Sequence, residues 1–238
     1  MIRPRNALFL VLACAAAIGP AACSTESGQP AASRDLASGA TSTPSATPAP
    51  TSSAEPPAAA PEPLALSPQA QADVDGRLIL AAKANDAAQV ATLIAAGGSV
   101  NAKDAIQDSA FLYAGAEGFN EVLQLTLAAG ADVASTNRYG GTALIPASEH
   151  GHTETVAILL TAGVPVNHVN NLGWTALQEA ILLNTGGPRQ QEVVRLLLAA
   201  GADPMIRDPE GRTALENAQR LGFTEIADLI MAGSTPGS

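Results

Sequence analysis

Glycine recurs after residue 67 at a nearly constant interval, and this period constrains the fold more than any other feature of the chain. Five such glycines follow similar apolar stretches at intervals of 33, 33, 38 and 32 residues: Gly97, Gly130, Gly163, Gly201 and Gly233. A second series repeats the intervals of 33, 33 and 38: Ser109, Thr142, Thr175 and Thr213. A period of this length indicates supersecondary units that stack on one another and bury a continuous core.

Each unit has the pattern of two short helices joined by a turn. In GGTALIPASEHGHTETVAILLTAGVPVN, one helix precedes Gly151 and a second follows it, with Val156 and Leu159 at helical spacing. We expect N-caps of the second helices at Asn120, Thr153 and Thr224. An acid suited to the positive end of the helix dipole follows each of them: Glu121, Glu154 and Glu225. The glycines after the second helices predict left-handed stops, at Gly130, Gly163 and Gly201.

The units resemble ankyrin repeats, about five of them between residues 75 and 233. The motifs that carry this resemblance are GxTxL from Gly173 and Gly211, GH at Gly151, and GAD from Gly130 and Gly201. The family's usual TPLH is altered throughout. TALQ and TALE stand in its place twice and predict capping boxes, which pair Thr175 with Gln178 and Thr213 with Glu216.

The resemblance implies an all-α repeat solenoid of helix-turn-helix units with hairpin loops, over residues 67–234 ahead of a tail at 235–238. Ankyrin stacks usually bind other proteins with their hairpin tips and with the concave face formed by their first helices, and few act as enzymes. We therefore expect a non-catalytic, monomeric protein-binding module with no cofactor and an unidentified protein partner. Trp174, the only tryptophan, either forms an exposed anchor with Tyr139 and Leu172 or packs against the neighbouring hairpin. By register, the candidate tip contacts are Ile106, Asp108, Arg138, Tyr139, Leu172, Trp174, Glu210 and Arg212.

The interval of 38 residues is about five longer than the others, and it contains the stretch NTGGPRQQ, residues 184–191. Gly186, Gly187 and Pro188 would break a helix, so this stretch predicts an enlarged turn between the two helices of the fourth unit. One interpretation is a loop that contacts the partner through Asn184, Arg189 and Gln190. Two others are a small anion-binding nest of backbone amides at the glycine pair and an insertion without function.

The first residues predict export. Residues 1–22 have the positive start and the apolar core of about a dozen residues that are typical of a signal peptide. Cys23, after two alanines, resembles the lipidated cysteine of a bacterial lipobox, although Pro20 stands where a branched apolar residue is usual. Ordinary cleavage nearby and lipidation of Cys14 are the alternatives. Residues 23–66 are rich in Ala, Pro, Ser and Thr and predict a disordered tether, so we expect display in the cell envelope through a lipid anchor.

Several other functions are not supported by the sequence. A net charge of −10 argues against binding to nucleic acid or to anionic lipid. The pair His150 and His152 lacks further ligands at metal-binding spacing, so no metal site is expected. No nucleophile elbow or phosphate-binding loop is present, which argues against an enzyme. Besides an envelope binding module, a secreted effector or immunity-type inhibitor, and a small-ligand binder, remain open.

Overall fold

A computed structural model describes residues 66–233 of the chain. The predicted signal peptide, Cys23, residues 24–65 of the predicted tether and the predicted tail lie outside the described residues. The described part contains ten helices and no strand. They are α1 (Pro68–Lys83), α2 (Ala87–Ala95), α3 (Ala110–Glu117), α4 (Asn120–Ala128), α5 (Leu144–Glu149), α6 (Thr153–Thr161), α7 (Ala176–Leu182), α8 (Pro188–Ala199), α9 (Ala214–Leu221) and α10 (Thr224–Gly233).

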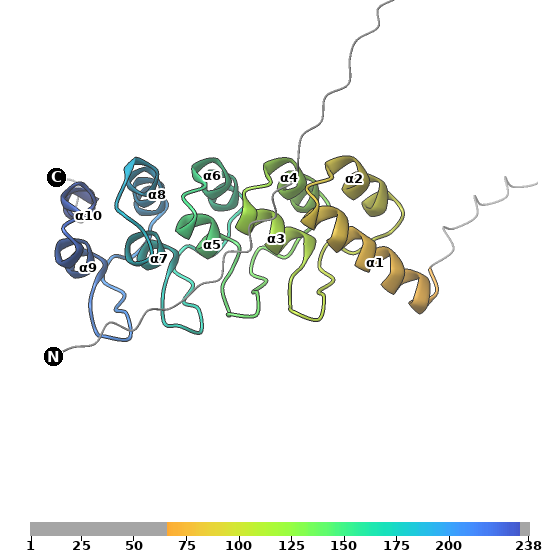
Figure 1. The fold of residues 1–238 in the computed structure, drawn as a ribbon, viewed down its shortest axis with the longest axis horizontal. Coiled ribbons are helices and arrows are strands. Elements are labelled where there is room, and N and C mark those ends of the chain that lie inside the picture. Colours follow the sequence, from red (N-terminus) through yellow and green to blue (C-terminus); the bar gives the residue numbers. More distant parts are fainter. Residues whose placement is uncertain (1–65, 234–238) are drawn as a thin grey trace, which may run out of the picture. The chain divides into compact units, whose positions relative to one another are not determined.

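The helices form five pairs stacked side by side, which confirms the predicted repeat solenoid (Figure 1). The odd-numbered helices lie in one row, the even-numbered helices in another, and the loops between pairs project from the odd-numbered row. We call the odd-numbered helices inner helices and the even-numbered ones outer helices. The four projecting loops are the hairpin tips of the second to fifth repeats, at residues 104–108, 137–141, 170–174 and 208–212.

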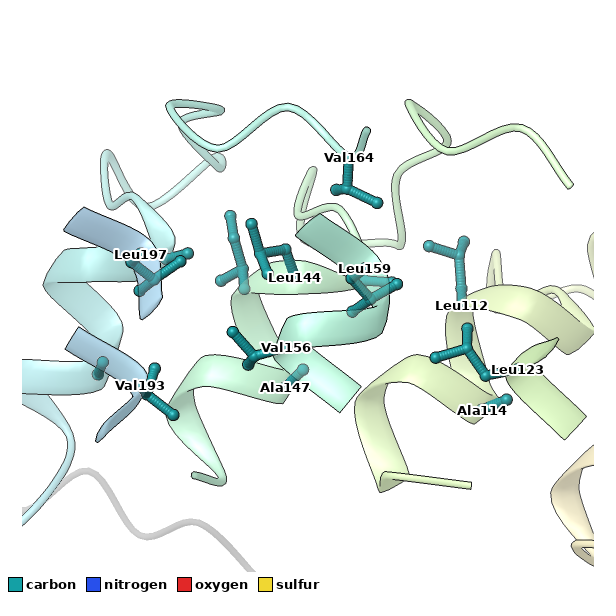
Figure 2. Packing of buried hydrophobic residues seen from close by; sticks show 14 of the residues in the cluster. Leu112, Ala114, Leu123, Leu144, Ala147, Val156, Leu159, Val164, Val193 and Leu197 are labelled. Atoms are coloured by element: carbon teal, nitrogen blue, oxygen red, sulfur yellow. The ribbon is translucent and has the colours of Figure 1, made fainter. Parts of the chain in front are cut away.

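One hydrophobic core runs through the stack. Figure 2 shows its central part, where Leu144 of α5 and Leu159 of α6 lie between Leu123 of α4 and Leu197 of α8. All four side chains are fully buried. Each repeat thus completes its core only against its neighbours, which explains why the sequence repeats its apolar positions with the period of the glycines.

The inner helices of the fourth and fifth repeats begin as predicted. In α7 the N–H of Gln178 donates to Thr175 Oγ1 (3.3 Å) and the N–H of Thr175 donates to Gln178 Oε1 (2.9 Å), a complete capping box. Thr213 and Glu216 form the second predicted capping box in α9, and Ser109 caps α3.

The third repeat begins differently, because its inner helix α5 contains a proline. Pro146 has no N–H to donate to the carbonyl of Thr142, whereas the equivalent N–H groups of the other repeats make this bond. Helix α5 is only six residues long, and Thr142 Oγ1 is buried without a hydrogen-bond partner.

The prediction of N-caps at Asn120, Thr153 and Thr224 is wrong. These residues are the first helical residues of α4, α6 and α10, and the cap positions of α4 and α6 make no side-chain bond. The reason is that the turn glycine and the residue after it already bend the chain into the helix. Asn120 instead accepts a hydrogen bond from the Thr155 hydroxyl of the next repeat (2.7 Å). The predicted glycine stops are confirmed, with φ between +83° and +88° at Gly130, Gly163 and Gly201.

The enlarged turn is confirmed in position but is shorter than predicted. It spans residues 183–187, because Pro188 is the first residue of α8 and Arg189, Gln190 and Gln191 are helical. A proline with its fixed φ suits the first position of a helix, so it starts α8 instead of extending the loop. Most of the extra length therefore goes into α8, which has 12 residues where the outer helices α2, α4 and α6 have nine.

Asparagine side chains also tie neighbouring repeats together. Asn101 donates to the carbonyl of the next repeat's stop glycine (3.1 Å) and accepts from the N–H of Asp132 (2.8 Å). Asn167 makes the equivalent bonds, to the carbonyl of Gly201 (3.1 Å) and from the N–H of Asp203 (2.8 Å). Between them in register lies Ala134, and the residue that it would reach, Pro165, has no N–H to offer. These bonds make the stack a preformed support for its hairpin tips.

Candidate functional site

The hairpin tips are held by their own first residues. Asn170 Oδ1 accepts from the N–H groups of Leu172 (3.0 Å) and Trp174 (3.1 Å). Asp104 and Asn137 accept from the same two positions of their own tips. These Asp and Asn residues are not among the predicted site residues. An Asp or Asn recurs in the sequence at the same distance before the glycine of each tip, or before the residue that replaces it, and this recurrence could have identified them. Their bonds fix the backbone that presents the exposed tip side chains.

Three apolar side chains occupy the same exposed tip position in successive repeats. Ile106, Tyr139 and Leu172 are 50%, 51% and 50% exposed, and each is 33 residues from the next. The tips of the third and fourth repeats are joined directly, since the N–H of Asn171 donates to the carbonyl of Tyr139 (2.9 Å). In the fifth repeat the same position holds Glu210, so this apolar row ends at the fourth repeat.

The other predicted tip residues lie within the domain's own contacts. Trp174 is half-buried, and its indole Nε1 is buried without a hydrogen-bond partner, so it packs into the stack more than it projects from it. Arg138 lies over the Tyr139 ring, 4.7 Å from its centroid, and pairs with Asp108 (3.3 Å). Of the proposed aromatic and aliphatic anchor, Tyr139 and Leu172 are therefore the exposed members.

An ion-pair network joins the first inner helix, α1, to the tip of the second repeat. Lys83 Nζ lies 2.7 Å from Asp104 and 3.1 Å from Asp108, and also 5.3 Å from the centre of the Tyr113 ring. Burial raises the pKa of Asp104, but the hydrogen bonds from Lys83 and from backbone N–H groups outweigh it and hold the pKa below its usual value. Cations and carboxylates here neutralise each other.

The fifth repeat neutralises its buried acid in the same way. Asp208 is 4% exposed and accepts from the N–H of Arg212 (2.7 Å) and from Asn217 Nδ2 (2.8 Å). Arg212 also pairs with it through the guanidinium (3.3 Å) and with Glu210 (3.0 Å). Burial raises the pKa of Asp208, yet these bonds and the Arg212 charge bring it below its usual value.

The fourth repeat contains a buried acid with no such compensation. Glu179 of α7 is also 4% exposed, and Asn170 Nδ2 donates to its Oε1 (2.7 Å). Burial first, and then the negative charge of Glu149, raise its pKa to about 7. In the described part of the chain, no ion pair includes Glu179 or Glu149. The sequence argument did not identify Glu179 at all, because nothing in its neighbourhood in the chain indicates burial beside a second acid.

The enlarged turn uses most of its polar groups internally. Asn184 Nδ2 donates to the carbonyl of Glu149 (2.8 Å), and Asn184 Oδ1 accepts from Gln190 Nε2 (2.9 Å). Arg189 alone of the three predicted contact residues is exposed. Gly186 lies in the left-handed region (φ +69°), and a Cβ there would come within 2.6 Å of the Phe223 ring. The turn therefore fits between the third and fifth repeats.

The histidines of the third repeat are engaged in packing. His150 Nδ1 lies 2.9 Å from the carbonyl of Ala116, and the His152 ring packs beside Gly118. Burial, with the nearby His150, lowers the pKa of His152. Within residues 66–233, no group of three or more His, Cys, Asp or Glu side chains is placed to hold a metal ion. The same residues include no helix that is both long and apolar enough to cross a membrane.

Comparison with known proteins identifies the family. A model of ankyrin repeats (three copies) matches residues 78–164 and 110–208 and so covers more than half of the chain. The chain belongs to the ankyrin repeat family.

The chain is also similar to individual ankyrin repeat proteins. It is 55% identical to an ankyrin repeat domain from Acinetobacter baumannii AYE, with a TM-score of 0.65 over 67% of this chain and 81% of that one. It is 42% identical to the ankyrin repeat protein EF0377, with a TM-score of 0.63 over 65% of this chain and 78% of that one. It is also 54% identical over 56 residues to the putative ankyrin repeat protein YahD of Escherichia coli K12. That match spans 24% of this chain and only 28% of YahD.

Proposed function

We propose that this protein is a non-catalytic binding module that presents the tips of its second to fourth repeats to another protein. The observation that supports this most directly is the row of half-exposed apolar side chains at Ile106, Tyr139 and Leu172. Aromatic side chains such as that of Tyr139 dominate the energy of protein interfaces, and the apolar contacts around them exclude water. The Asx bonds within the tips and the asparagine bonds between repeats supply that support, so little ordering entropy opposes binding.

The test is capture of a partner from intact cells by chemical cross-linking, with the full chain as bait. In the double variant Tyr139→Ser/Leu172→Ser we expect loss of at least about nine-tenths of the captured partner. The reason is that two anchors that the partner buries together contribute several kcal/mol of binding free energy. Met205→Ser is the matched control, because Met205 is 65% exposed but is not part of the apolar row. Circular dichroism must show that all three proteins are equally folded. Equal capture by the double variant and the wild type would refute the proposed surface.

We propose further that the domain is displayed in the bacterial cell envelope by a lipid on Cys23. This part rests on the sequence alone: the signal-peptide pattern of residues 1–22, the small residues before Cys23, and the Ala/Pro/Ser/Thr-rich stretch that follows. Labelling of cells with a radioactive fatty acid should mark the wild-type protein and not the Cys23→Ser variant. Release of unlabelled wild-type protein into the medium would instead favour a secreted effector or inhibitor.

A further inference from the structure

The surface shared by the inner helices and the tips carries uncompensated negative charge beside exposed apolar groups. We call this surface the inner face and define it by Ile106, Tyr139, Glu149, Leu172 and Leu183, with the buried Glu179 next to Glu149. Inner helices and tips are in direct contact there: Lys83 of α1 pairs with Asp104 on the tip of the second repeat, and Asn170 on the tip of the fourth repeat donates to Glu179 of α7.

The cations of the inner face are already occupied. Lys83 and Arg138 pair with Asp104 and Asp108, and Arg212 pairs with Asp208 and Glu210. No ion pair in the described part of the chain includes Glu149 or Glu179, the acids of the third and fourth inner helices. Across residues 66–233 there are eighteen acidic and nine basic side chains, and this excess of negative charge favours a partner segment of positive charge.

Glu149 and Glu179 lie close together although they belong to different repeats. The Asn184 amide nitrogen is 2.8 Å from the carbonyl of Glu149 and 3.4 Å from that of Glu179, so a single side chain spans both backbones. Glu179 is almost completely buried, with an amide as its only hydrogen-bond partner on Oε1. A carboxylate in this setting gains most from a cation supplied from outside, because screening by water is weak there.

The apolar row is connected to this acid pair through the tip of the fourth repeat. Leu172 is two residues from Asn170, which holds Glu179, and Leu183, which is 41% exposed, follows α7 directly. Neighbouring helices pack about 8–10 Å apart, and an extended chain rises about 3.3 Å per residue. One repeat of the stack therefore corresponds to about three residues of an extended partner segment.

We propose, as a deepening of the proposed function on which it rests, that the inner face binds an extended segment of a partner protein in which an apolar side chain recurs every third residue and a basic side chain lies at the fourth repeat. The apolar side chains contact Ile106, Tyr139 and Leu172, and a lysine or arginine is placed against Glu149, the partly exposed member of the acid pair, next to the buried Glu179. The net charge of −10 opposes a nucleic acid, and it equally opposes a second copy of this acidic chain.

The test uses labelled synthetic peptides of about fifteen residues, five copies of Leu-Ser-Lys, with Leu-Ser-Gln and Leu-Ser-Glu peptides as matched probes. Fluorescence anisotropy measures their binding to the full chain. We expect the lysine peptide to bind at least about tenfold more tightly than the glutamine peptide, and the glutamate peptide not to bind. The double variant Glu149→Gln/Glu179→Gln should remove most of the advantage of the lysine peptide.

The matched control is Glu225→Gln/Asp228→Asn, which removes the same charge from exposed positions on the outer helix α10. Full retention of the lysine preference in this control is expected, and an equal loss in both double variants would show only general charge attraction and overturn the inference. Equal binding of the lysine and glutamine peptides, abolished by Tyr139→Ser/Leu172→Ser, would overturn the basic partner while leaving the proposed function intact. Absence of binding by every peptide at about 1 mM would overturn the inference as well, and the cross-linking capture would still test the proposed function by itself.

Discussion

The fourth and fifth repeats contain the same buried pair of an acid and an amide with the two residues exchanged. In the fifth repeat the acid, Asp208, is on the tip and the amide, Asn217, is on the inner helix nine residues later. In the fourth, Asn170 is on the tip and Glu179 is on the helix, again nine residues later. Arg212 compensates the acid of the fifth repeat, whereas the acid of the fourth faces another carboxylate, that of Glu149.

The exchange shows how one fold position serves two purposes. At the end of the stack, an acid that is neutralised by its own tip stabilises the last hairpin at no cost in specificity. In the fourth repeat, the acid is Glu179 on the inner helix, and no cation pairs with it. Its burial therefore lowers the free energy of unfolding. Such a local loss is expected where a site is formed for a partner.

The largest expected effect is the removal of the compensated acid. Asp208→Ala leaves Asn217 Nδ2 and the N–H of Arg212 without their acceptor and removes an ion pair of the Arg212 guanidinium, so we expect the free energy of unfolding at pH 7 to fall by about 3 kcal/mol. Urea denaturation followed by circular dichroism measures this. Glu210→Ala, which removes only the exposed partner of Arg212, should cost at most about 1 kcal/mol. Similar losses in both variants would contradict the assigned difference.

Removal of the uncompensated acid, Glu179, should raise the free energy of unfolding instead of lowering it. The pKa of Glu179 is about 7 in the folded chain against 4.5 for an unperturbed glutamate, so its contribution to stability is full below pH 4.5 and is lost as the pH rises through 7. Glu179→Gln keeps an oxygen for Asn170 and removes the titration. We expect it to raise the unfolding free energy by about 2 kcal/mol at pH 8 and to change little at pH 4.

The lowered pKa of Asp208 reverses this dependence, since its contribution is present at neutral pH and is lost as the pH falls through its folded value. The two acids thus give the stability curve opposite slopes. If Glu179→Gln were neutral or destabilising at pH 8, the fourth repeat would not differ from the fifth in the way described.

The turns of the same two repeats give the smallest effect. Gly186 and Gly222 both have positive φ, +69° and +75°, but only Gly186 has a neighbour, Phe223, within the reach of an added Cβ. We expect Gly222→Ala to cost about 1 kcal/mol for the backbone conformation alone. Gly186→Ala should cost about 2 kcal/mol, because the Phe223 ring must also move. Thermal unfolding of the two variants side by side measures the difference, and equal midpoints would place Phe223 elsewhere.

The fold was predictable because its information is periodic and local. The spacing of Gly130, Gly163 and Gly201 and the capping pairs of Thr175 and Thr213 each specify a structure within a few residues of the chain. Where the prediction failed, at Asn120 and Thr153, the helix start was decided by the preceding turn glycine and by a bond to the next repeat, neither of which is visible in a short window.

The candidate surface was only partly predictable. The register placed Ile106, Tyr139 and Leu172 on the tips, and the structure finds all three half-exposed. Their role in binding remains a prediction. The state of Glu179 could not be predicted, because it depends on burial by the neighbouring repeats and on the charge of Glu149, thirty residues earlier. Likewise, only the packed structure shows that Asn184 and Gln190 bond to each other.

The most direct test of the central claim is the titration of the Glu179 carboxyl by carbon-13 NMR, in the full chain alone and with the Leu-Ser-Lys peptide at saturation. The free protein should titrate near pH 7, and the bound lysine should lower this pKa by about one unit or more, since a cation at hydrogen-bond distance favours the ionised form. The Asp208 carboxyl, already compensated, should titrate below 3.8 in both samples. A Glu179 titration near 4.5 in the free protein, or one unchanged by bound peptide, would contradict the claim that the fourth repeat holds an uncompensated acid for a basic partner.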